Sequence, residues 1–62
     1  MHKTPLEGAI EKAGGTAEMA KMLGISSQAI SQWVRVPVNR VLAVEALTQV
    51  PRHELRPDVY PE

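Results

Sequence analysis

The stretch from Thr16 to Arg35, TAEMAKMLGISSQAISQWVR, constrains the fold more than any other part of this chain. It predicts two short helices joined by a tight turn, with Gly24 where the backbone must reverse and Ala20 where the helices must approach closely. Thr16 is expected to cap the first helix and Ser26 the second, because hydroxyl oxygens accept hydrogen bonds from free backbone N–H groups at helix starts. The stretch therefore predicts a helix-turn-helix motif.

The second of these helices, expected over residues 26–35, has two different faces. Ala29, Ile30 and Trp33 fall on one side of a helical projection. Trp33 is expected to make the largest apolar contribution to the core, since it is the one tryptophan in a chain without phenylalanine. The opposite side carries hydrogen-bonding side chains: Ser27, Gln28, Ser31, Gln32 and Arg35.

That polar side differs from an ordinary solvated face, which would use Glu and Lys because they favour helices and solubility. Neutral side chains that both donate and accept hydrogen bonds can read base edges without repelling phosphates, and arginine can neutralise phosphates. The composition of this face therefore predicts contact with a nucleic acid.

The charge of the chain indicates that electrostatic attraction contributes only modestly to binding a nucleic acid. The 62 residues carry no formal net charge, which argues against a general nucleic-acid coat. From Met19 through Val44, however, no acidic residue occurs, and Lys21, Arg35 and Arg40 lie within this range. Because few cations can neutralise phosphates, affinity per monomer should be low, which favours dimerisation on the target. Lys21 is a candidate phosphate contact on these grounds.

Several other classes of protein are disfavoured. The chain has no cysteine, which excludes disulfides and thiolate metal sites. No apolar run approaches the roughly 18 residues needed to cross a bilayer, so we expect a cytoplasmic protein with no membrane contact. His53 has no second ligand at metal spacing, and methionines at helical spacing, Met19 and Met22, are more often core filler than a metal or partner site. No cofactor, metal, small-molecule substrate or enzymatic activity is expected, because no acid pair, nucleophile set or phosphate-binding glycine loop is found.

The flanking segments predict the scaffold. Met1 to Lys3 is expected to be a frayed terminus in which His2 has no role. Thr4, Pro5 and Glu7 form a helix start with a capping box. An apolar stripe follows on a helix that ends at Gly14 and Gly15, and its members are Leu6, Ala9, Ile10 and Ala13.

A further helix, expected from Pro37 or Asn39 to about Gln49, is apolar around nearly its whole circumference, at Val38, Val41, Leu42, Val44, Ala46 and Leu47. Such a helix needs two apolar neighbours: one is the core, and the other is either a second subunit or the C-terminal tail over Val44 and Leu47. Glu45 should pair with Arg52 or Arg56. Pro51 opens a last helical turn to Leu55, after which Val59 and Tyr60 fold back over the core or meet a partner. No strand is expected.

With Ala20, Gly24, Ile30 and Trp33 in place, the chain resembles the phage Cro and repressor class of helix-turn-helix proteins. More narrowly, LGISSQAISQWVR, VNRVLAVEALT and HELRPDVY are similar to the small Cro-like proteins grouped as YdaS-like. The resemblance covers nearly the whole chain and implies one domain, residues 1–62, with a lambda-repressor-like fold of four to five short helices around the motif at 16–35. One departure is Thr16, which stands where phage repressor motifs often begin with glutamine.

In that family the second helix of the motif enters the major groove. The resemblance thus implies base contacts from Ser27, Gln28, Ser31 and Gln32, and phosphate contacts from Thr16, Arg35 and Arg40. It implies a transcriptional repressor that binds a pseudo-palindromic double-stranded DNA operator as a homodimer, weakly associated without DNA. Two alternatives are a YdaS-type antitoxin or lysogeny-control regulator and a protein–protein interaction module.

Overall fold

The all-α fold predicted from the sequence is confirmed. The computed structural model describes residues 3–61, so the expectation for Met1 and His2 lies outside the described residues. Within residues 3–61 the chain forms five α-helices and one 3-10 helix, and no strand occurs. In chain order they are α1 (Pro5–Ala13), α2 (Thr16–Leu23), α3 (Ser27–Ser31), η1 (Val38–Arg40), α4 (Val41–Thr48) and α5 (Arg52–Leu55).

Helix α1 begins at the predicted cap, Thr4, and ends at the predicted glycines, while the Glu7 carboxylate bonds to the Thr4 hydroxyl and not to its backbone N–H. The Thr4 hydroxyl oxygen accepts a hydrogen bond from the Glu7 backbone N–H at 3.1 Å and donates one to the Glu7 carboxylate at 3.1 Å. At the other end Gly14 adopts the left-handed conformation, with φ of 100°. The N–H groups of Gly14 and Gly15 then bond back to carbonyls of the last turn, which closes the helix in a Schellman motif.

Helix α2 starts differently from the prediction. Gly15, not Thr16, occupies the capping position, and its carbonyl accepts the first helical hydrogen bond from Met19 at 3.0 Å. Thr16 is already helical and makes no capping bond, so the predicted cap is wrong. The physical reason is that Gly14 and Gly15 both take positive φ and turn the chain directly into the helix, which leaves no extended position for the threonine.

The turn between α2 and α3 has the predicted chemistry. Gly24 ends α2 with φ of 72°, and the N–H of Ile25 bonds to the Ala20 carbonyl at 3.0 Å. Ser26 caps α3, since its hydroxyl oxygen accepts from the Ala29 N–H at 3.1 Å. Three residues therefore join two packed helices, which is the helix-turn-helix arrangement.

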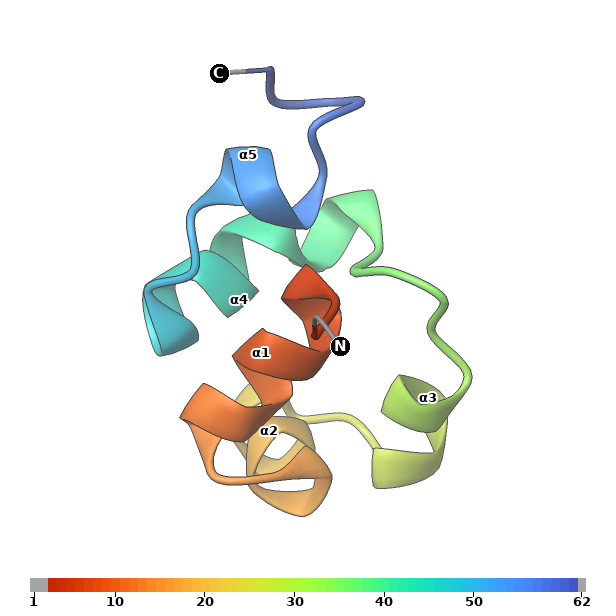
Figure 1. Cartoon of the computed structure of the whole chain (residues 1–62). Coiled ribbons are helices and arrows are strands. Elements are labelled where there is room, and N and C mark those ends of the chain that lie inside the picture. Colours follow the sequence, from red (N-terminus) through yellow and green to blue (C-terminus); the bar gives the residue numbers. More distant parts are fainter. Residues whose placement is uncertain (1–2, 62) are drawn as a thin grey trace.

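Helix α3 is shorter than the expected 26–35. It ends at Ser31, and residues 33–37 run as an irregular segment along one side of the molecule (Figure 1). Pro37 contributes to this, because proline disfavours helical backbone in the residue before it. Trp33 thus lies beyond the helix and is partly exposed while packing against the core. The fully buried positions belong to smaller side chains: Met19, Ile30, Val36, Val41 and Val44.

Helix α4 lies between the motif and the tail. It packs against α1, α2 and α5, and in Figure 1 it lies above α1 while α3 lies at the lower right. Glu45 pairs with Arg52 as predicted, at 3.1 Å, and also accepts the Arg52 backbone N–H at 2.7 Å. Val44 is fully buried, but Leu47 is 40% exposed, so the tail does not cover both residues.

Two methionines on α2 give a matched test of this core. Met19 is fully buried, whereas Met22 is 50% exposed. Met19→Ala should lower the free energy of unfolding by about 2–5 kcal/mol, because it removes a buried side chain and leaves a cavity. Met22→Ala should change it by no more than about 0.5 kcal/mol. Urea unfolding followed by circular dichroism measures both, and equal losses would contradict this assignment of the core.

Candidate nucleic-acid interface

The polar face of α3 is exposed. Ser27, Gln28, Ser31 and Gln32 all have exposed side chains, while Ile30 on the other side is 1% exposed. Burial of Ile30 and the cap at Ser26 fix the rotation of the helix, so the amides of Gln28 and Gln32 face away from the body. The structure thus brings the four predicted base-contacting residues together, three on α3 and Gln32 at its C-cap.

Ser31 differs from its three neighbours in what it can offer a ligand. Its hydroxyl donates to the carbonyl of Ser27 at 3.0 Å. A hydroxyl has one hydrogen and two lone pairs. While this bond holds, Ser31 can therefore accept a hydrogen bond from a ligand but has no hydrogen left to donate.

The predicted phosphate-contacting residues are spread over three elements. Thr16 and Lys21 belong to α2, Arg35 follows α3, and Arg40 ends η1. Lys21 and Arg35 are exposed, whereas Thr16 and Arg40 are half-buried. The structure therefore leaves Lys21 and Arg35 more accessible than the other two.

The segment between α3 and η1 is fixed at both ends. The Trp33 N–H bonds to the Ile30 carbonyl at 3.0 Å, and the Val36 side chain is 1% exposed. Val34 between them is 93% exposed. The sequence did not predict this exposed valine, because the helix was expected to continue through this position.

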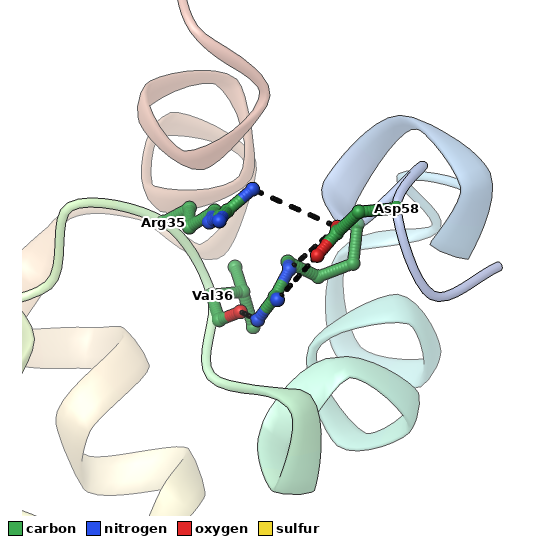
Figure 2. A network of polar contacts seen from close by, with 4 residues as sticks. Arg35, Val36 and Asp58 are labelled. Carbon is green, nitrogen blue, oxygen red and sulfur yellow. Dashed lines mark hydrogen bonds and ion pairs between the residues drawn. The ribbon is translucent and has the colours of Figure 1, made fainter.

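A network of polar contacts ties the tail to this segment (Figure 2). The Arg56 guanidinium makes a two-pronged contact with the Asp58 carboxylate, at 2.9 Å from Nε and 2.7 Å from Nη2. Its remaining nitrogen, Nη1, donates to the Val36 carbonyl at 3.0 Å. Arg35 then points at the same carboxylate, with 3.7 Å between its Nη1 and Asp58 Oδ1.

This network perturbs the titration of its members. The hydrogen bonds from Arg56 lower the pKa of Asp58 from 3.8 to about 2, and the charge of Arg35 acts in the same direction. The same hydrogen bonds raise the pKa of the Arg56 guanidinium above its usual value. Elsewhere, the Arg52 backbone N–H lowers the pKa of Glu45. Asp58 is therefore an anion throughout the neutral range.

Sequence reasoning did not find the role of Asp58. It offered Arg52 and Arg56 as possible partners of Glu45. In the structure Arg52 forms the ion pair with Glu45, and Arg56 pairs with Asp58. The spacing of Arg56 and Asp58 on either side of Pro57 was the available signal, since a proline turn can bring such a pair together. Nothing local in the sequence links them to Arg35.

Other kinds of site receive no support in the described part of the chain. Residues 3–61 contain no group of three His, Asp or Glu side chains able to hold a metal ion. None of the helices formed by these residues is long and apolar enough to span a membrane. A depression of about 250 Å³ lies between α1 and α5, and no residue of α2 or α3 lines it.

The packed helix pair, its three-residue turn and the exposed face of α3 define a small all-helical helix-turn-helix domain. Residues 6–62 match the family described as "Bacterial toxin YdaS", and the chain belongs to this YdaS family. The resemblance seen in the sequence is therefore confirmed.

One curated relative is similar over most of the chain. It is the Escherichia coli (strain K12) protein described as "Putative transcriptional regulator YdaS", 38% identical over 52 residues, with 74% of this chain and 53% of the relative covered. The chain thus spans about half the length of the relative that it matches. Neither description names an enzymatic activity. No solved structure matches the chain.

The network around Asp58 predicts an acid-sensitive contribution to stability. A carboxylate whose folded pKa lies below its unfolded value stabilises the fold above the unfolded pKa and loses this effect as pH falls through the folded pKa. Asp58 should contribute fully above about pH 4 and progressively less towards pH 2. Asp58→Asn should have a lower free energy of unfolding than wild type at neutral pH. This difference should narrow as the pH falls from about 4 to 2.

Urea unfolding at a series of pH values measures this difference. Glu54→Gln is the matched control, because Glu54 is an exposed carboxylate of α5 for which residues 3–61 provide no ion pair. It should follow the pH profile of the wild type. An Asp58→Asn profile parallel to wild type down to pH 2 would contradict the assignment.

Proposed function

We propose that this protein is a sequence-specific double-stranded DNA-binding regulator of transcription that places α3 in the major groove. The observation that carries the proposal is the exposed, uncharged, hydrogen-bonding face of the second helix of the motif, at Ser27, Gln28, Ser31 and Gln32. The description of its Escherichia coli relative as a putative transcriptional regulator supports the same class. Repression would follow from occupying a promoter, and the role requires no catalysis, cofactor or small-molecule substrate.

The amides of Gln28 and Gln32 suit adenine. A glutamine can donate to N7 and accept from the N6 amino group at once, a contact that discriminates against other bases by roughly 1–3 kcal/mol. Ser31, whose hydrogen is engaged by the Ser27 carbonyl, fits a base amino group, which only donates. A half-site with at least one A·T pair is therefore expected.

Phosphate contacts would position the helix without reading sequence. Lys21 and Arg35 are the exposed candidates, and Arg40 and Thr16 are half-buried ones. No acidic residue occurs from Met19 through Val44, the stretch that holds Lys21, Arg35 and Arg40. In the folded chain, however, Asp58 of the tail lies 3.7 Å from Arg35. With so few cations the salt dependence should be moderate, since each neutralised phosphate contributes about 0.9 to the slope of log K against log salt.

The binding unit in this proposal is a homodimer on a pseudo-palindromic operator, with recognition helices about 34 Å apart. Apolar residues along η1 and α4 stay exposed on the monomer: Val38 at 46%, Leu42 at 51% and Leu47 at 40%. They are the surface on which a second subunit would pack. Because this surface is small, pairing should be weak without DNA.

Sedimentation tests the dimer directly. We expect a monomer–dimer equilibrium at high protein concentration, which Leu42→Lys should shift to monomer by burying a charge in the interface. Lys12→Ala, a change on exposed α1, is the control and should leave the equilibrium unchanged. A wild-type protein that remains monomeric even on its operator would contradict the dimer.

The proposed base contacts of Gln28 and Gln32 can be tested separately. Gln28→Ala and Gln32→Ala should each lower the preference for the selected duplex over unrelated duplex by about 5- to 150-fold, the equivalent of 1–3 kcal/mol. Arg35→Ala should instead weaken binding to both duplexes alike and reduce the salt slope by about 1. Fluorescence anisotropy over a range of salt concentrations measures each variant.

Gln49→Ala is the matched control, since it truncates a glutamine that follows α4, whose C-terminal end lies on the other side of the molecule from α3 (Figure 1). It should keep the wild-type preference. If Gln28→Ala and Gln32→Ala also keep it, the base contacts are wrong. Salt-insensitive binding to a protein, with no duplex bound, would favour an interaction module instead.

A second role is favoured by the description of the family, which names a bacterial toxin. An antitoxin or a lysogeny-control regulator of this fold would use the same DNA contacts as the proposed regulator. The roles separate on the cellular consequence: a regulator changes transcription from its operator, whereas a toxin arrests growth when it is expressed alone.

A further inference from the structure

The carboxylate of Asp58 is held at a fixed place beside the segment that follows α3. Arg56 grips both of its oxygens, at 2.9 and 2.7 Å, and binds the Val36 carbonyl at 3.0 Å. The Arg56 side chain is 12% exposed, and Val36 is 1% exposed. Because Val36 is buried and Arg56 is largely so, Asp58 is positioned relative to the backbone that carries Arg35 (Figure 2).

Arg35 forms an ion pair with this carboxylate but no hydrogen bond to it. The 3.7 Å between Arg35 Nη1 and Asp58 Oδ1 exceeds the 2.7–2.9 Å that is usual for a charge-assisted hydrogen bond. The Arg35 side chain is 61% exposed and that of Asp58 is 42% exposed. Exposed pairs of this kind are weak and exchange readily for another anion.

We propose that Asp58 is a built-in competitor for Arg35, holding the guanidinium that would otherwise bind a DNA phosphate and so lowering affinity for DNA of every sequence. This inference rests on the proposed function. A phosphate that approaches Arg35 must displace the carboxylate or share the guanidinium with it, and the two anions repel each other. Because Arg56 keeps Asp58 in place, the carboxylate does not simply swing away.

The competitor makes affinity depend more on bases and less on phosphates. Phosphate contacts carry no sequence information, so weakening one of them lowers binding to all duplexes equally. A stable complex then forms only on duplexes where the base contacts of α3 supply enough additional binding free energy. Asp58 is a positioning residue in this scheme and touches no base.

The test is a double-mutant cycle on the full chain, with anisotropy measured on a duplex selected from a random library and on an unrelated duplex of equal length. Asp58→Asn should bind both duplexes about two- to fivefold more tightly at low salt, with the gain shrinking as salt rises. In the Arg35→Ala background the same change should produce a clearly smaller gain. Urea unfolding confirms that each variant is folded.

Glu54→Gln is the matched control for net charge, because it removes one exposed carboxylate that lies outside the network. Its gain should be smaller than that of Asp58→Asn. An equal gain, or an Asp58→Asn gain unaffected by Arg35→Ala, would overturn the competitor while leaving the proposed function standing. Failure of the wild type to bind any duplex would instead overturn the proposed function.

A second measurement compares wild type with Arg35→Ala, a variant that leaves the hydrogen bonds between Arg56 and Asp58 intact. The carboxylate carbon of Asp58 is followed by NMR in wild type and in Arg35→Ala, with and without the selected duplex. In the wild type, DNA should move this signal towards its position in free Arg35→Ala, because Arg35 has been released. A wild-type signal that DNA leaves unchanged would contradict the competitor, even if Asp58→Asn does not fold.

Discussion

The three-residue turn between α2 and α3 sets the orientation of α3 against the body of the protein. Gly24 reverses the chain in a left-handed conformation, and the N–H of Ile25 closes the end of α2 onto the Ala20 carbonyl. A side chain at Gly24 would be strained by this backbone even though open space surrounds it. Because the turn is short, Ile30 is carried into the core and the opposite face of α3 is left in solvent.

The other end of α3 is fixed by contacts that are distant in sequence. Residues 33–37 leave the helix irregularly, and Val36 and the grip of Arg56 on its carbonyl hold them against the body. The tail therefore contributes to the site by stabilising the segment that carries Arg35. In this way a chain of 62 residues without disulfides fixes a helix of only five residues from both sides.

The sequence predicted most features that depend on nearby residues, with the cap of α2 as the exception, because Gly15 and not Thr16 occupies that position. The caps at Thr4 and Ser26 and the turn at Gly24 could be read because each involves residues within about one helical turn. The early end of α3 could not, since residues 32–35 continue the helical pattern and tertiary packing of Trp33 and Val36 decides their conformation. Nor could the contact of Arg35 with Asp58, which joins positions 23 residues apart through the fold of the tail.

In the proposed function, base contacts supply much of the affinity, because the four polar side chains on α3 and its C-cap carry no charge and few cations lie around them. Selection of bound fragments from a random duplex library measures this most directly. We expect enrichment of a two-fold symmetric consensus with an A·T pair in each half-site, and loss of that consensus when Gln28 and Gln32 are both replaced by alanine. Recovery of fragments with no shared sequence, from a folded wild-type protein, would contradict it.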